Sequence, residues 1–245
     1  MTKTIFAFCV ASLALGYARA QDCAKFLFLQ KGKTVEMTIY DKKGGPNGRQ
    51  VYTVNDVSNG GGTTTGTLNS EMFDKNGNSK AKATSIIMCS GGEMHFDMKL
   101  YLPPQQTEQV GNKMQANVNA QTSFLNYPGN MKVGDNLPDG NFSMDLTNSA
   151  PPPPGGGPGG PPPPPFGART VTIVISNRHV EAQESVTTSA GTWDCFRISY
   201  KSKVSVKTGP LGFPVNIEGT EWYAPGFGIV KTQSKYGGTA ITSIK

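Results

Sequence analysis

Three side chains with metal-binding and acid–base chemistry stand at alternate positions of one segment: Glu93, His95 and Asp97. In an extended strand these positions share one face, with successive side chains about 7 Å apart. Their oxygen and nitrogen atoms could converge on a metal ion, or Asp97 could orient His95 as a base. We favour the simpler interpretation of a solvated strand face, because polar alternation predicts such residues without any function.

Enzyme motifs are missing from the sequence. It contains no Gly-x-Ser-x-Gly, His-Glu-x-x-His or Cys-x-x-Cys segment, and only 2 His. The glycine-rich stretch 60–66 lacks the Lys and the helix of a phosphate-binding loop, so it predicts a hairpin loop. We therefore expect a protein that is not an enzyme and needs no cofactor. A metal-dependent hydrolase using Glu93, His95 and Asp97 is kept as an alternative.

A basic stripe is the stronger candidate for ligand binding. Four cations share one face of the segment 195–207, opposite an apolar face: Arg197, Lys201, Lys203 and Lys207. Such a stripe could attract lipid headgroups or acidic glycans. Acidic residues on neighbouring strands could equally neutralise it and leave an ordinary solvated face.

Trp222 and Tyr223 form a second candidate ligand site. They precede Ala224–Gly228, where Pro225 fixes φ and two glycines permit positive φ, so a tight turn or bulge is expected. The two rings either pack beside this turn, which we favour, or offer an aromatic platform to a ligand.

These residues must be positioned by strands. Apolar and polar residues alternate strictly through 93–102, with Met94, Phe96 and Met98 on the apolar side, and the same period recurs near 35–39, 142–146, 171–175 and 196–206. Short turns rich in Gly, Asn and Pro separate these runs. The pattern predicts an all-β protein: an antiparallel meander curled into a barrel or half-barrel, as in lipocalins and lipoprotein carriers, or folded into two layers. Its interior could be a cavity or a filled core.

The first twenty residues have the features of a signal peptide. Lys3 precedes an apolar run, and Ala18-Arg19-Ala20 supplies the small residues for cleavage before Gln21. We expect an exported chain, in the periplasm or at the outer-membrane or extracellular surface, with no transmembrane segment after cleavage. Loss of Lys3 and Arg19 reduces the net charge from +6 to +4, too low to indicate nucleic-acid binding.

The cysteines fit an oxidising compartment. Once Cys9 leaves with the leader, Cys23, Cys89 and Cys195 remain, which allows one disulfide and one spare thiol. We favour the Cys23–Cys89 pair, although spacing alone does not decide among the three pairings.

A Pro/Gly tract interrupts the pattern at 151–167. The alternating runs on either side have similar lengths, which predicts a disordered insertion within a hairpin of a single β domain, residues 21–245. The insertion is either a length-tolerant loop or an arm for a proline-recognising partner.

Three segments resemble a known family: Tyr40–Gly44, Ala190–Phe196 and the Trp-Tyr-x-Pro-Gly-x-Gly block within Trp222–Lys231. They are similar to exported β proteins of Gram-negative bacteria catalogued as domain of unknown function 3108, the DUF3108-like or TapB-like proteins. The resemblance covers most of 22–245 except the Pro/Gly tract. It implies an all-β periplasmic or surface protein and supplies no catalytic residues.

Together these observations favour a non-enzymatic protein of the cell envelope that holds an apolar or amphipathic ligand in a concave sheet face. Its partners would be a lipid, a glycan or an envelope protein. The alternatives are a structural or adhesive protein acting through the Pro/Gly arm, and the hydrolase considered above.

Overall fold

The computed structural model describes residues 23–101, 123–146, 169–208 and 211–245. These residues form β-strands, joined by turns and three short 3-10 turns, η1 (Cys23–Lys25), η2 (Leu27–Leu29) and η3 (Met98–Tyr101). The strands are β1 (Thr34–Asp41), β2 (Pro46–Gly60), β3 (Thr63–Asp74), β4 (Ser79–Ser90), β5 (Glu93–Asp97), β6 (Phe124–Tyr127), β7 (Asn136–Leu137), β8 (Gly140–Leu146), β9 (Arg169–Thr188), β10 (Gly191–Thr208), β11 (Leu211–Ala224), β12 (Gly228–Ser234) and β13 (Gly237–Ile244).

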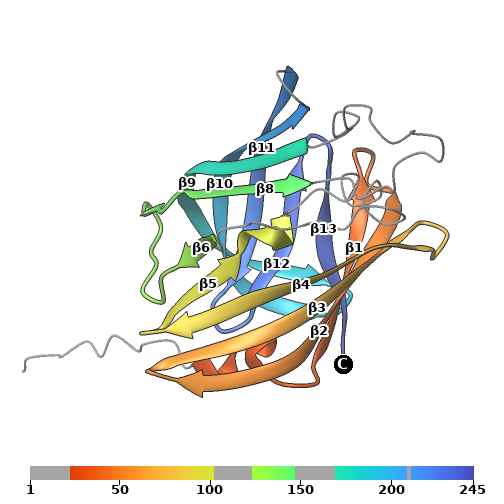
Figure 1. Ribbon diagram of the computed structural model, residues 1–245. Helices are drawn as coiled ribbons and strands as arrows, with labels where there is room; N and C mark the ends of the chain where they lie inside the picture. Colours follow the sequence, from red (N-terminus) through yellow and green to blue (C-terminus); the bar gives the residue numbers. More distant parts are fainter. Residues whose placement is uncertain (1–22, 102–122, 147–168, 209–210) are drawn as a thin grey trace, which may run out of the picture.

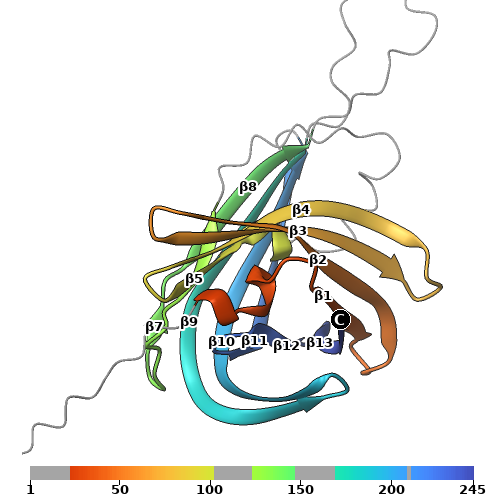
Figure 2. The ribbon, with the colours of Figure 1, turned by 90° about the horizontal axis from the view of Figure 1, so that it is seen from below.

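All strands belong to one antiparallel sheet with the order β6-β5-β4-β3-β2-β1-β13-β12-β11-β10-β9-β7, and β8 also pairs with β9. The sheet curls into a nearly closed barrel with one seam, between β6 and the β7–β9 side (Figure 1 and Figure 2). The predicted all-β antiparallel barrel is confirmed.

Alternation determines which side of each strand faces the core. In β1, Val35 and Met37 are buried while their neighbours are partly exposed. Glycine turns join the strands: Gly61 and Gly62, with φ of 58° and 77°, connect β2 to β3. The hairpin predicted at 60–66 is present, but its loop is only these two residues, and 63–66 belong to β3. A side chain at positive φ would be strained, so glycine suits this turn.

One predicted strand is shorter than expected. The alternation through 93–102 predicted a single strand, but β5 ends at Asp97 and the chain enters η3. The buried Asp97 carboxylate accepts the Lys99 backbone N–H at 3.0 Å and that of Ile86 at 3.4 Å. A carboxylate that bonds the backbone two residues ahead favours a turn over a continuing strand.

The N-terminal segment Cys23–Leu29, here called the plug, lies inside one end of the barrel (Figure 2). Phe26 and Phe28 are buried, and the Phe28 ring meets those of Tyr52, Phe96 and Phe227 at centroid distances of 6.1 to 6.5 Å. A Cβ at Gly66 of β3 would lie 2.6 Å from the Phe28 carbonyl oxygen. Glycine there lets the plug approach the wall.

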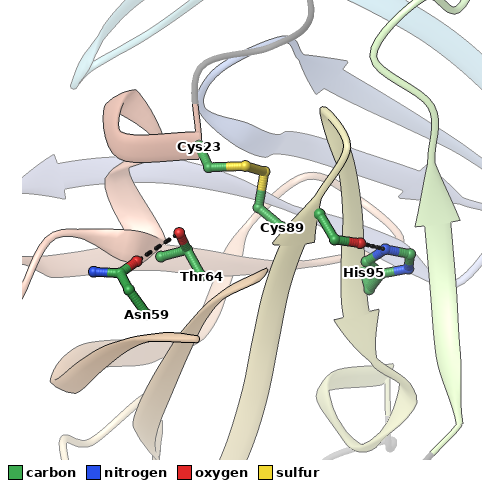
Figure 3. Close-up of a disulfide and its surroundings, with 6 residues drawn as sticks. Cys23, Asn59, Thr64, Cys89 and His95 are labelled. Carbon is green, nitrogen blue, oxygen red and sulfur yellow. Dashed lines mark hydrogen bonds between the residues drawn. A yellow bond between two sulfur atoms is a disulfide. The ribbon is translucent and has the colours of Figure 1, made fainter. Parts of the chain in front are cut away.

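A disulfide between Cys23 and Cys89 joins the plug to β4, with a Cα–Cα distance of 5.7 Å (Figure 3). This is the pairing favoured from the sequence. Cys195 is a buried free thiol. Burial raises its pKa to about 12, with smaller contributions from the carboxylates of Asp194 and Glu184, so the thiol is protonated at neutral pH.

The β9–β10 hairpin bends back across the outside of the barrel towards β13 (Figure 2). At its tip, the Ser189 hydroxyl donates to the Thr242 carbonyl oxygen at 3.2 Å. A small second core, formed by Cys195, Ala224 and Val230, lies against Val186 and Trp222. The hairpin therefore covers part of the outer face of β11 and β12.

The strands on either side of the Pro/Gly tract are direct neighbours. Phe142 of β8 pairs with Ile173 of β9, and the ladder runs to Leu146 and Arg169. The tract 151–167 and the leader 1–20 lie outside the described residues. Their predicted roles stay predictions.

The disulfide should carry much of the stability of the plug. Its ends are 66 residues apart, and closing such a loop restricts the unfolded chain by about 4 kcal/mol in the chain-entropy model. The variant Cys23→Ala/Cys89→Ala should lose unfolding free energy of that order in urea titrations. Cys195→Ser is the control that keeps the disulfide. Equal urea midpoints for the double variant and the native chain would show that the bridge contributes nothing.

Candidate functional site

A cavity of about 350 Å³ lies inside the barrel. Its deep part is lined by buried apolar side chains from the plug and from strands on several sides of the barrel: Phe28, Leu68, Ile87, Phe96 and Ile175. Inward residues of strands around a barrel converge on its axis. The cavity is therefore the space that the inward faces and the plug leave unfilled.

The other part of the cavity reaches the β12–β13 turn, at the upper end in Figure 1, where Tyr236 is 54% exposed. Its lining there includes uncharged polar residues, here called the rim: Gln50, Ser202, Thr232, Ser234 and Thr239. The Thr232 and Thr239 hydroxyls are 2.9 Å apart and hydrogen-bonded, and Ser234 Oγ donates to the Gly237 carbonyl oxygen at 3.1 Å. The cavity thus changes from apolar to polar towards solvent.

Two tyrosines of the cavity wall stay neutral at physiological pH. Burial raises the pKa of Tyr52 well above its ordinary value. It does the same for Tyr200, where the Glu221 carboxylate adds to the rise and Arg178 opposes it. Because burial disfavours the phenolate, both residues contribute only neutral hydroxyls.

A charged cluster is buried beside the seam. Arg178 and Glu221 are 1% exposed or less, and Arg178 Nη2 lies 3.3 Å from Glu221 Oε1. The same carboxylate oxygen accepts the Tyr127 hydroxyl of β6 at 2.8 Å. Tyr127 stacks on Tyr223 with centroids 4.4 Å apart, and the Arg178 guanidinium lies 4.5 Å from the Tyr127 ring centre. We call these four residues the seam cluster.

Arg178 also bonds directly to the backbone at the seam. Its Nη1 donates to the carbonyl oxygens of Asn126, in β6, and Pro138, at 3.0 and 3.1 Å. β6 is the end strand of the sheet, and Arg178 belongs to β9 on the other side of the seam. Among the described residues no strand ladder joins the two edges, and one guanidinium bridges them instead.

A β-bulge turns Arg178 inward. Asn177 and Arg178 together stand opposite Tyr200, and Asn177 has a φ of 53°. Before this point Ile173 and Ile175 face the core, and the extra residue makes Arg178, rather than Asn177, the next inward side chain. The Asn177 backbone N–H donates to Asp139 Oδ1 at 3.1 Å, which stabilises this conformation.

The DUF3108-like family model matches residues 30–151 and 167–243. The chain belongs to the DUF3108-like family. The interruption of the match falls on the Pro/Gly tract, and the resemblance seen in the sequence is confirmed. No curated protein matches this DUF3108-like chain.

Two solved structures share the fold of this DUF3108-like protein. One is a presumed exported protein with a YmcC-like fold from Bacteroides fragilis NCTC 9343, with TM-score 0.65 and 22% identity over 90% of this chain and 98% of that one. The other is a presumed lipoprotein from Parabacteroides distasonis ATCC 8503, with TM-score 0.67 and 21% identity over 92% of this chain and 100% of that one. At these identities the likeness establishes the fold alone.

The DUF3108-like structure keeps Glu93 and His95 of the candidate metal site together and turns Asp97 away from them. The Ser90 hydroxyl donates to His95 Nε2 at 3.2 Å (Figure 3). His95 Nδ1 then donates to Asn126 Oδ1 at 3.0 Å, so both ring nitrogens are occupied. Glu93 lies 3.7 Å from this ring, whereas Asp97 bonds the backbone at the strand end. Among the described residues, no group of three or more acidic, His or Cys side chains is arranged to hold a metal ion.

The basic stripe lies on the outer face of β10 and is partly neutralised. Arg197 contacts both Glu181 and Glu184 at 3.2 Å, and Lys201 lies 3.6 Å from Glu218. Lys203 and Lys207 are exposed further along the strand. None of the four stripe residues lines the cavity. Their predicted role in ligand binding stays a prediction.

Trp222 and Tyr223 do not form one platform, because adjacent strand residues face opposite sides. Tyr223 is fully buried in the seam cluster. Trp222 lies on the outer face, where its Nε1 donates to Glu184 at 2.6 Å and Lys231 Nζ lies 4.7 Å from the ring centre. Both rings therefore pack, but on opposite sides of β11: Tyr223 in the interior, and Trp222 against the small outer core of Cys195, Ala224 and Val230.

In the described part of the chain no helix is long and apolar enough to cross a membrane. The residues that shape the interior most, Arg178 and Glu221, were not selected from the sequence as a pair. Glu221 directly precedes the Trp-Tyr block and shares a strand face with the buried Tyr223. This position could have indicated from the sequence that its carboxylate faces inward. The bulge that turns Arg178 inward has no comparable signature.

The seam cluster predicts that replacing Arg178 and replacing Arg197 lower the unfolding free energy by very different amounts. Arg178→Met leaves the Glu221 carboxylate buried without its cation and should cost about 3–5 kcal/mol of unfolding free energy. Arg197→Met removes a partly exposed arginine with two acidic partners and should cost less than about 1 kcal/mol. Urea denaturation measures both.

A double variant separates charge burial from packing. Arg178→Met/Glu221→Gln removes the uncompensated charge and should regain part of the stability that Arg178→Met loses. Equal costs for Arg178→Met and Arg197→Met would contradict the assigned role of the buried pair.

Proposed function

We propose that this protein is an exported, non-enzymatic β protein of the cell envelope that holds an apolar or amphipathic ligand inside its barrel. The cavity carries the proposal. It is enclosed by apolar side chains, closed by the plug at one end and connected to the surface at the β12–β13 turn. Concave, mostly apolar spaces of about 300–1,000 Å³ with a few polar groups are typical ligand sites.

Several observations support export. The sequence begins with a leader-like segment, and the Cys23–Cys89 disulfide is typical of oxidising compartments. The two structural neighbours are described as a presumed exported protein and a presumed lipoprotein. We place the protein in the periplasm or at the outer surface, with lipid, glycan or another envelope protein as its partner class.

The geometry supports ligand holding over catalysis. The candidate base His95 bonds Asn126 and Ser90 in the wall, and the thiol of Cys195 is buried and protonated. Neither residue lines the cavity. An interior lined by hydroxyl, amide and apolar groups suits binding of an intact molecule.

A copurifying ligand is the first test. Native mass spectrometry of the exported protein, followed by organic extraction, should detect a small apolar or amphipathic molecule in a complex that dissociates on unfolding. A mass equal to that of the mature polypeptide alone, together with no binding of a neutral apolar dye, would refute the proposal.

Adjacent isoleucines of β4 provide a matched pair of variants. Ile87 is 1% exposed and lines the cavity, whereas Ile86 faces the other side of the strand and is absent from the lining. Ile87→Phe should narrow the cavity and weaken binding of the neutral dye 1-N-phenylnaphthylamine by about tenfold, a change of about 1.4 kcal/mol. Ile86→Phe should leave dye affinity unchanged in the same fluorescence titration. An equal effect of both substitutions would place the dye elsewhere.

A further inference from the structure

We propose that the cavity selects uncharged ligands: one apolar chain whose polar end is a hydroxyl, ester or amide group, and not a carboxylate, phosphate or ammonium. This inference rests on the proposed function and specifies the ligand class for the same site. Its basis is the distribution of charge and of uncommitted hydrogen-bonding groups around the cavity.

The described residues that line the cavity include no Asp, Glu, Lys, Arg or His. Tyr52 and Tyr200 in the wall are neutral because burial raises the pKa of each phenol hydroxyl. An ionised ligand group entering this space would leave water without meeting an opposite charge. Burying an ion without a partner is strongly unfavourable, whereas a hydroxyl or amide needs only hydrogen bonds.

Charges near the cavity are already paired or exposed to solvent. Behind Tyr200, Arg178 and Glu221 form a buried pair. On the outer face of β10, Lys201 pairs with Glu218. Lys235 of the β12–β13 turn is exposed, with Nζ 5.1 Å from the Tyr236 ring centre. Solvent screens such an exposed cation, so it provides little attraction for an anion inside.

The rim supplies neutral hydrogen-bonding groups for the polar end of the ligand. The side chains of Gln50 and Ser202 line the cavity, and neither has a hydrogen-bond partner within the described part of the protein. They lie on β2 and β10, with four strands between them in the sheet order. An amide and a hydroxyl on separated walls can each bond a hydroxyl or carbonyl oxygen of the ligand.

The cavity volume limits the apolar part. A space of about 350 Å³ is at the small end of the range for ligand sites, about 300–1,000 Å³. It leaves room for at most one chain, and its apolar depth towards Phe28 and Phe96 places the tail at the plug. The polar end then lies at the rim near the β12–β13 turn.

Competition between two lipids of equal chain length tests this selection. The native protein is loaded with 1-N-phenylnaphthylamine, and 1-monopalmitoylglycerol or palmitate is added at pH 8, below the micellar concentration of each. The monoacylglycerol should displace the dye at least about tenfold more effectively than the ionised fatty acid. Equal displacement by both lipids would overturn the inference while leaving the proposed function intact. Absence of dye binding would instead overturn the proposed function.

A charge-gain variant makes the test specific to the rim. Gln50→Lys introduces a cation into the lining and should increase competition by palmitate about tenfold, whereas Gln50→Met should not. Ser202→Lys provides a second position if Gln50→Lys does not fold. Lys235→Gln should leave the ratio of the two lipids unchanged. Selection for the neutral lipid that persists with a folded lysine variant at either position would contradict the role of the rim.

Discussion

The buried ion pair between Arg178 and Glu221 is the interaction on which the shape of the interior depends. A long curled sheet has two edge strands with unpaired backbone groups, and these must be satisfied if the barrel is to close. Here β6 and the β7–β9 side approach each other without a continuous ladder. Arg178 bonds the Asn126 carbonyl across this seam, while Tyr127 of β6 donates to Glu221 of β11. Each charge has its counter-ion and further hydrogen bonds, which is the condition under which burying both is tolerated.

Closure of the seam gives the cavity its walls, and the plug gives it an end. The Cys23–Cys89 disulfide holds the plug against β4, and Gly66 allows the close approach of its backbone. The opposite end has small polar and glycine residues at the β12–β13 turn, with the Tyr236 ring exposed to solvent beside them. The inward side chains of the strands do not fill the barrel up to its axis, so a space remains between the plug and this turn. Its neutral lining follows from the same arrangement, since the interior charges are used to close the seam.

Much of the fold could be predicted from alternation and turn residues, because both act locally. The inward faces of β1, β8 and β9 and the turn at Gly61 and Gly62 follow these rules. Local rules failed where a long-range contact or an extra residue changed the pattern. Asp97 ended β5 early by bonding the backbone, and the bulge at Asn177 moved Arg178 from the expected outer face to the core. Family resemblance located the Trp-Tyr block, but only the strand geometry showed that Trp222 and Tyr223 face opposite sides.

In this account a nearly closed barrel encloses an uncharged cavity, and we propose that an apolar molecule occupies it. A crystal structure of the protein with 1-monopalmitoylglycerol tests this most directly. The account predicts density for one chain running from Phe28 towards Ser234, with the glycerol hydroxyls within hydrogen-bond distance of Gln50 or Ser202. A cavity filled by rearranged side chains, or lipid bound only on the outer face of β10, would contradict it.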